Sequence, residues 1–140
     1  MRRTPGTEPI DIETFVDAFH RLDLNRFEQH LADDLRWMNP PAPTIAGRAT
    51  TMRILRMWVR LVPGFAMTPI RHERTGDTIV IDRTDIVPVT RRFVLEFRVL
   101  GTFDIVDDKV VAWEDKLTLR NGVSAIVQAF RQWLALIRSA

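Results

Sequence analysis

The second half of the chain alternates apolar and polar residues over four consecutive stretches, and this alternation constrains the fold more than any other feature. Successive side chains of a strand point to opposite faces, so alternation of this kind predicts strands with one buried face. The stretches cover residues 65–74, 78–87, 93–105 and 109–119. The short turn sequences TGD and VDDK separate the members of each pair. We therefore expect two antiparallel hairpins, linked by the segment PVTRR.

Amphipathic helices are expected before and after these strands. Residues 10–22 and residues 48–62 carry apolar side chains at helical spacing, and the second pattern stops at Pro63 and Gly64, a helix-ending pair. Residues 123–140 show the same periodicity at the end of the chain. All three segments are expected to pack an apolar face on the sheet.

The region between the first two of these helices is less regular. Residues 25–35 favour a short helix with Asn25 as its cap and with Phe27 and Leu31 facing inward. Residues 35–39 then alternate and predict a short strand, which ends at the sequence PPAP because proline supports neither a helix interior nor a strand ladder.

This order of elements predicts an α+β fold. A chain of 140 residues has the size of one domain, which we assign to residues 1–140 with residues 1–9 as a short flexible tail. Helices grouped before and after a run of antiparallel strands cover one face of the sheet. If the sheet curves, the helices and the concave face enclose a single apolar pocket, where small molecules usually bind.

Several classes of function and location are disfavoured by the composition. No apolar run approaches the ~20 residues of a membrane span, and no secretory signal follows Met1, so we expect a cytoplasmic protein without a membrane partner. The absence of cysteine excludes thiol nucleophiles and thiolate metal sites. His20, His30 and His72 lie on separate predicted elements, so we expect no metal site. Basic and aromatic residues do not interleave, so we expect no nucleic-acid partner.

Polar residues recur on the apolar faces of three predicted strands. Arg83 and Asp85 share a face with apolar neighbours, Asp115 shares one with Val111 and Trp113, and Asn39 ends the face of the short strand. Isolated buried charges would each cost several kcal/mol, so these groups are expected to pair with one another.

The charges of this group are unbalanced. One arginine between two carboxylates leaves one negative charge in excess, and a shared proton relieves it by leaving one carboxylic acid and one carboxylate near neutral pH. An acid facing a base across a substrate is the arrangement that acid-base catalysis requires. A structural ion-pair network without catalytic function remains the alternative interpretation of Arg83, Asp85 and Asp115.

Four sequence blocks give a resemblance to a known family. LRWMNPPAP, DRTD, LGTFDI and AWEDKL, in this order and at these separations, resemble the limonene-1,2-epoxide hydrolases, and the resemblance extends from about residue 10 to residue 120. It implies the cone-shaped fold of nuclear transport factor 2, in which helices pack on the concave face of a curved mixed sheet. It also implies hydrolysis of an epoxide in one step without a metal, an organic cofactor or a covalent intermediate.

The resemblance assigns a role to each polar residue. It implies that Asp115 is the general base which deprotonates water, that Asn39 helps to hold this water, that Asp85 is the general acid and that Arg83 bridges the carboxylates. Trp37 occupies the place of a tyrosine typical of the family. An indole donates a hydrogen bond but accepts none, so the water would be held differently here.

An apolar pocket suits an alicyclic, terpene-like or aryl epoxide, with water as the second substrate. The resemblance also implies a homodimer. Each of the candidate wall residues could instead belong to the plain hydrophobic core. They are Trp37, Leu95, Phe97, Val99, Phe103 and Leu117 from the strands and Met52, Leu55, Trp58, Val59 and Val62 from the helix before them.

Three other functions could use the same fold. A ketosteroid-isomerase-like enzyme would need a tyrosine donor, and the chain contains no tyrosine. A polyketide-type or epoxide-opening cyclase could use the same acid and base with a substrate hydroxyl in place of water, and would need a larger pocket. A non-catalytic module that binds a small ligand or dimerises is the third, and it would tolerate asparagine at both aspartates.

Overall fold

The computed structural model describes residues 11–118 and the isolated positions 131, 135 and 138. The tail predicted for residues 1–9 and nearly all of the helix predicted over residues 123–140 lie outside the described residues. The elements follow in the order α1 (Ile12–His20), α2 (Leu24–Gln29), β1 (Leu31–Met38), β2 (Ile45–Ala46), α3 (Arg48–Leu61), β3 (Ala66–Thr75), β4 (Thr78–Pro88), β5 (Val94–Val106) and β6 (Lys109–Thr118).

The strands form one six-stranded sheet in the order β2-β1-β6-β5-β4-β3. β1 runs parallel to β6, and every other neighbouring pair of these strands is antiparallel. Both predicted hairpins, β3–β4 and β5–β6, are present at the expected turns. The prediction of a mixed sheet is confirmed.

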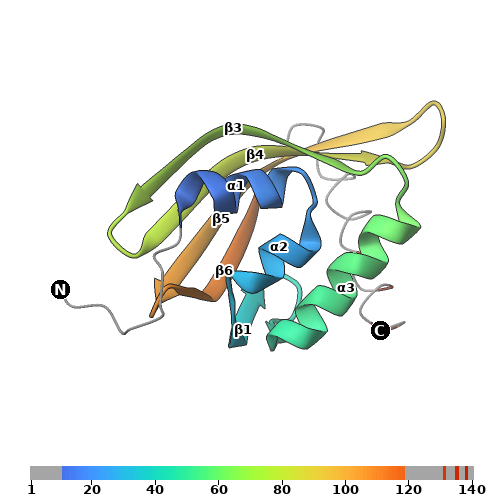
Figure 1. Cartoon of the computed structure of the whole chain (residues 1–140). Helices are drawn as coiled ribbons and strands as arrows, with labels where there is room; N and C mark the ends of the chain where they lie inside the picture. The colour runs from blue at the N-terminus through green and yellow to red at the C-terminus, as the bar shows by residue number, and fades with distance from the viewer. Residues whose placement is uncertain (1–10, 119–130, 132–134, 136–137, 139–140) are drawn as a thin grey trace.

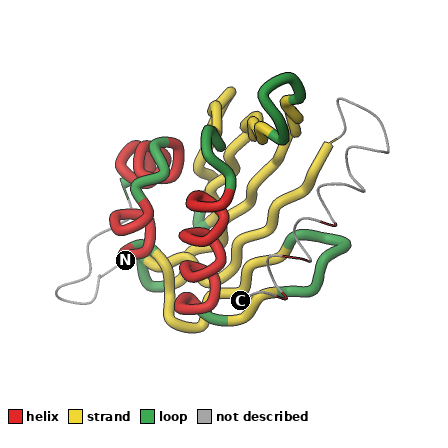
Figure 2. The backbone as a smooth tube through the Cα atoms, turned by 90° about the vertical axis from the view of Figure 1, so that its right-hand side faces the viewer, coloured by secondary structure: helices red, strands yellow, loops and turns green. Residues whose placement is uncertain are grey.

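Helices and strands lie in two layers. Figure 1 shows α1, α2 and α3 on the same side of the sheet, with the long strands β3, β4 and β5 bending around them. The side view in Figure 2 shows the helices in one layer and the strands in the other. The α+β architecture with helices on the concave face of a curved sheet is therefore as predicted.

Local sequence explains where α1 and α3 form. Asp11 caps α1 by accepting a hydrogen bond from the backbone N–H of Glu13, and the helix buries Phe15 and Phe19. α3 follows Gly47, whose φ of 96° favours glycine, and it buries Met52 on the sheet side. With 14 residues α3 is the longest described helix. None of the described helices is long and apolar enough to cross a bilayer.

The predicted helix over residues 25–35 is wrong in its cap and in its end. Asp23, rather than Asn25, caps α2 by accepting from the backbone N–H of Arg26 at 3.3 Å. α2 ends at Gln29, and Leu31 begins β1, where it pairs with Val110 of β6. Strand pairing thus overrides the helical periodicity of the segment. β2, only two residues long, was not predicted.

A bulge changes which residue of β6 faces the helices. Ile105 pairs with Val110 whereas Asp104 pairs with Ala112, so one extra residue, Val111, enters β6 at this point. Val110 is consequently buried, and Val111 is only half-buried. The predicted position of Val111 on the inner face is therefore wrong, because a bulge reverses the alternation.

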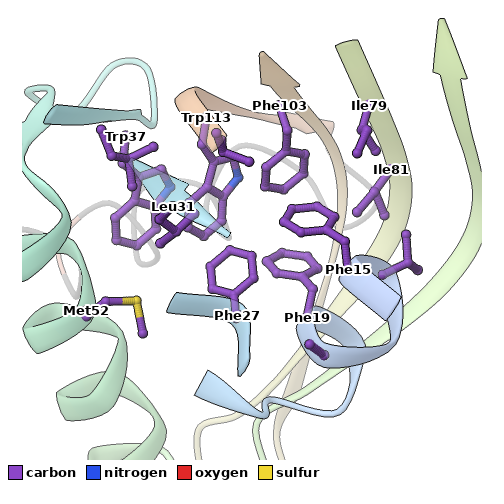
Figure 3. Close-up of a cluster of buried hydrophobic side chains, with 14 of the residues drawn as sticks. Phe15, Phe19, Phe27, Leu31, Trp37, Met52, Ile79, Ile81, Phe103 and Trp113 are labelled. Atoms are coloured by element: carbon purple, nitrogen blue, oxygen red, sulfur yellow. The ribbon is translucent and has the colours of Figure 1, made fainter. Parts of the chain in front are cut away.

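Aromatic rings dominate the core between the layers (Figure 3). Phe15 and Phe19 of α1 contact Phe103 of β5 with ring centroids 5.0 and 5.5 Å apart. Phe27 of α2 reaches Trp113 of β6 at 5.5 Å, with the rings close to perpendicular. This cluster fixes α1 and α2 against the middle of the sheet, next to the polar residues of β4 and β6.

Candidate active site

Arg83 and Asp85 of β4 meet Asp115 of β6 on the concave face, although β5 lies between these two strands. Arg83 pairs with Val99 of β5, and Asp115 pairs with Gly101, two residues further along the same strand. The guanidinium of Arg83 therefore reaches diagonally across β5 to the carboxylate of Asp115.

Gly101 is the residue that allows this approach. A Cβ atom at this position would lie 2.8 Å from Nη1 of Arg83 and 3.0 Å from Oδ1 of Asp115, closer than carbon atoms normally approach. A glycine inside a strand commonly marks a close approach of another group, and this one does so.

The guanidinium of Arg83 bridges the two carboxylates. Nε and Nη2 donate to Oδ1 and Oδ2 of Asp85 at 2.8 and 3.4 Å. Nη1 and Nη2 donate to Oδ1 and Oδ2 of Asp115, both at 3.1 Å. Each carboxylate thus receives the forked, charge-assisted pairing that arginine geometry favours.

Little of this group is accessible to water. Arg83 and Asp115 are 3% and 4% exposed, and the side chain of Asp85 is 16% exposed. Burial raises the pKa of Asp85, and the attraction of Arg83 offsets only part of this rise. Burial alone would lower the pKa of Arg83, but Asp115 and Asp85 more than compensate and raise it. Arg83 is therefore cationic at neutral pH, and Asp85 is the carboxyl that holds a proton more readily than a free aspartate.

Other side chains complete the polar group. Nε1 of Trp113 donates to Oδ1 of Asp115 at 2.7 Å. The ring of Phe19 lies 4.9 Å from the guanidinium carbon of Arg83, within the range of a cation–π contact. Nδ2 of Asn39 is buried and has no hydrogen-bond partner among the described residues.

These groups lie in the wall of an apolar cavity of about 150 Å³, which also contacts α1, α2, α3 and the loop after β1. The four predicted polar residues, Asn39, Arg83, Asp85 and Asp115, all line it. So do six of the predicted apolar wall residues, namely Trp37, Leu55, Trp58, Val59, Phe97 and Leu117.

The remaining predicted wall residues do not line the cavity. Phe103 is stacked on Trp113 in the core, and Met52 is fully buried on the sheet side of α3. Leu95 and Val99 belong to a second buried cluster of β4 and β5. Val62 packs against that second cluster as well. Alternation identifies the inner face of a strand but does not tell which part of that face borders a cavity and which part packs in the core.

Sequence reasoning missed part of the wall. The residues concerned are Phe19, Leu22, Leu24, Phe27, Pro40, Pro41, Ala42, Phe65, Met67, Val87 and Trp113. Two signals were present in the sequence, because the proline loop directly follows Asn39 and Trp113 lies two residues before Asp115. The contribution of α1 and α2 depends on tertiary packing.

No group of three or more His, Cys, Asp or Glu side chains in the described part of the chain is arranged to hold a metal ion. His72 pairs instead with Glu13 at 2.9 Å, and Nδ1 of His20 contacts the backbone oxygen of Met67. The candidate chemistry is that of the two carboxyl groups and the arginine that line the cavity.

Known proteins share this fold. An LEH-like epoxide hydrolase from Mycobacterium tuberculosis is 23% identical, with 92% of this chain and 93% of that chain covered and a TM-score of 0.64. An NTF2-like protein of unknown function from Burkholderia pseudomallei is 21% identical, with 76% and 87% covered and a TM-score of 0.65. A protein of ketosteroid-isomerase-like fold from Catenulispora acidiphila, solved in complex with trimethylamine, is 14% identical, with 83% and 88% covered and a TM-score of 0.64.

These similarities confirm the predicted NTF2-like fold. No curated protein matches the chain. The sequence profile described as the limonene-1,2-epoxide hydrolase catalytic domain matches residues 7–128, which is most of the chain. This chain accordingly belongs to the limonene-1,2-epoxide hydrolase family.

Proposed function

We propose that this protein is an epoxide hydrolase that adds water to an apolar epoxide by general acid-base catalysis and releases a vicinal diol. One observation supports this most strongly. Arg83 holds the carboxyl groups of Asp85 and Asp115 together in the wall of an apolar cavity, and the two groups have different environments. A carboxyl group with a raised pKa, such as that of Asp85, beside a second carboxyl group is what acid and base roles require.

Asp115 acts as the general base. It takes a proton from a water molecule as the oxygen of that water attacks one epoxide carbon. Asn39 lines the same cavity, and its Nδ2, which has no hydrogen-bond partner among the described residues, donates a hydrogen bond to this water. Trp37 cannot accept a proton from the water, so Asp115 is the acceptor.

Asp85 acts as the general acid. As the bond between the attacked carbon and the epoxide oxygen breaks, the proton of Asp85 passes to that oxygen and the second hydroxyl of the diol forms. Burial raises the pKa of Asp85, which favours the protonated form that this role needs. After turnover Asp115 is protonated and Asp85 is ionised, so one proton must return from Asp115 to Asp85 through solvent or the shared hydrogen-bond network.

The substrate is a compact alicyclic or aryl epoxide. Apart from the polar group, the cavity wall is formed by aliphatic and aromatic side chains, which cannot solvate a charged substrate. An apolar cavity near 150 Å³ is known to accommodate a single benzene-sized ring. This size favours an epoxide that carries a single ring over the polycyclic substrate of a cyclase. The protein works as a homodimer in the cytoplasm and needs no cofactor.

The first test is diol formation from limonene-1,2-epoxide, cyclohexene oxide and styrene oxide without added metal, followed by chiral gas chromatography. Asp115→Asn and Asp85→Asn are each expected to abolish turnover and to leave the far-UV circular dichroism unchanged. Asp82→Asn is the matched control, because Asp82 lies next to Arg83 on β4 but its carboxylate pairs with Arg98, whose side chain points away from the cavity. This control is expected to keep its activity.

A single turnover with enzyme in excess in H₂¹⁸O separates direct attack by water from a covalent mechanism. Direct attack puts ¹⁸O into the diol in the first turnover, whereas an ester on an aspartate would deliver unlabelled oxygen from the carboxylate. Absence of diol from every epoxide, or full activity of Asp115→Asn, would contradict the proposal and favour the cyclase or the non-catalytic module.

A further inference from the structure

We propose that Trp113 is a positioning residue that decides which oxygen of Asp115 accepts the proton of water, and that Trp37 and Phe103 hold Trp113 in the required orientation. The inference rests on the proposed function for the proton step. The geometry behind it does not depend on the identity of the substrate.

The two oxygens of Asp115 have different hydrogen-bond partners. Oδ1 accepts from Nε1 of Trp113 at 2.7 Å and from Nη1 of Arg83 at 3.1 Å. Oδ2 accepts from Nη2 of Arg83 at 3.1 Å, and no other donor to it is found among the described residues. A carboxylate oxygen offers two lone pairs, so Oδ1 is saturated while Oδ2 keeps one acceptor site. Oδ2 is therefore the oxygen that receives the proton.

The orientation of the Trp113 indole is fixed on all sides. Its ring is stacked with that of Trp37 at 4.5 Å and 14° and with that of Phe103 at 5.4 Å and 21°. Figure 3 shows Trp37 and Phe103 on either side of Trp113. Phe19 and Phe27 contact it edge-on, each at 5.5 Å. A rotation of the indole away from Asp115 would disrupt these contacts and would leave a buried N–H without a partner.

Backbone register places the stack where it is needed. Trp37 of β1 is aligned directly with Trp113 of β6 in the parallel pair, so the two rings project side by side from neighbouring strands. Asp115 follows Trp113 by two positions and points to the same face of β6. The donor and the acceptor of the 2.7 Å bond are thus held by one strand, and the ring of Trp37 supports them from the next.

The indole N–H also stabilises the ionised form of the base. The charged groups in contact with Asp115 within the described structure are limited to Arg83, which in turn contacts Asp85. A neutral donor on Oδ1 adds stabilisation of the carboxylate without adding a second cation. Without this donor, we expect the enzyme to need a higher pH to reach the same activity.

Trp113→Phe tests the role of the N–H, because it keeps an aromatic ring in the stack. We expect a roughly 10- to 100-fold decrease in kcat, because Asp115 is no longer held in position and misplacement of a catalytic group by about 1 Å can cost ~100-fold. The acid limb of the kcat/KM profile is expected to move to higher pH. Trp58→Phe is the matched control, since Trp58 lines the cavity and contacts Phe65 but donates no hydrogen bond to Asp115. This variant is expected to change KM and to leave the acid limb where it is.

Two further variants keep the test decisive if Trp113→Phe folds poorly. Replacement of the Trp113 side chain by 3-benzothienylalanine preserves the fused ring and puts sulfur in the place of the N–H, and the same shift is expected. Trp37→Leu removes the stacking partner, and a smaller shift in the same direction is expected. An acid limb that stays unmoved with benzothienylalanine at position 113 would overturn the proposal.

A measurement without substrate separates this inference from the proposed function. The Trp113 indole N–H, followed by ¹H–¹⁵N NMR in the free protein, is expected to exchange with solvent faster in Asp115→Ala than in the wild type, because the variant removes the acceptor of the 2.7 Å hydrogen bond. Absence of diol from every epoxide would refute the proposed function while this exchange difference still showed the hydrogen bond. Equal exchange rates in the two proteins would refute the positioning role even if the wild type were an active hydrolase.

Discussion

Replacement of Arg83 by alanine is expected to destabilise the protein by about 3–5 kcal/mol at neutral pH, the range found when one partner of a buried ion pair is removed. Arg83 is almost fully buried and donates four hydrogen bonds to two carboxylates. Its removal leaves both carboxylates in an apolar environment without their shared cation. The same substitution is expected to abolish catalysis, because the acid and the base lose the group that holds them together.

The size of this effect can be measured by heat or denaturant. For 140 residues the entropy of unfolding near the melting temperature is about 0.3 kcal/mol/K, so the expected decrease in Tm is about 10–17 °C. Urea unfolding at pH 7, followed by tryptophan fluorescence, gives the free energy of unfolding directly. The m-value should stay unchanged if the variant keeps the native fold.

The loss of stability caused by Arg83→Ala is expected to depend on pH in a defined direction. Burial raises the pKa of Asp85 above that of a free aspartate, so ionisation of Asp85 destabilises the folded state as pH rises through this raised pKa. Removal of Arg83 takes away the attraction that offsets part of the increase which burial causes in the pKa of Asp85. The difference between wild type and variant should therefore be largest near neutral pH and decrease towards pH 4, where carboxyl groups become protonated.

Arg98→Ala is the matched control on the other face of the sheet. Arg98 forms a similar forked pair with Asp82, at 3.0 and 2.8 Å, but its guanidinium side chain is 39% exposed. Solvent screens such a pair, so we expect a much smaller loss of stability and no loss of activity. Equal destabilisation by the two substitutions, or an Arg83→Ala protein that turned over at the wild-type rate, would refute the account of Arg83.

Two further predictions concern the rate. Diol formation is expected to fall as pH rises through the raised pKa of Asp85, because the acid then loses its proton; a rate that stayed constant into the alkaline range would argue against Asp85 as the acid. Gly101→Ala is expected to reduce kcat by at least about tenfold and stability by about 1–3 kcal/mol, because the added Cβ would separate Arg83 from Asp115. Thr102→Ala, next in the strand and facing the opposite side, is the control and should behave as the wild type in both assays.

Much of the fold could be predicted because local periodicity and turn residues agree with the final packing. The α1 and α3 helices and the two hairpins follow their patterns closely. The boundary at residue 31 was missed because parallel pairing with β6 decides it, and that pairing joins segments about 80 residues apart. The bulge at Val111 was missed for the same reason, since it is a property of two paired strands.

The polar residues of the candidate site could be identified from one strand at a time. Arg83, Asp85 and Asp115 each interrupt an apolar face, which is visible without a structure. Their convergence depends on strand order and register and on the absence of a side chain at Gly101. The boundary between cavity wall and core cannot be predicted in this way, so the sequence could not decide whether Met52 and Phe103 line the cavity or belong to the core, where the structure places them.

The choice of an indole as the additional donor follows from the charge of the site. Asp85 can act as an acid only while it keeps a proton, and burial raises its pKa against the attraction of a single guanidinium. A lysine or a second arginine in the place of Trp113 would stabilise Asp115, but its charge would also favour ionisation of Asp85. The neutral N–H of Trp113 orients Asp115 at 2.7 Å and carries no net charge. A hydrogen bond from a neutral donor therefore orients the general base, Asp115, and does not favour loss of the proton from the general acid, Asp85.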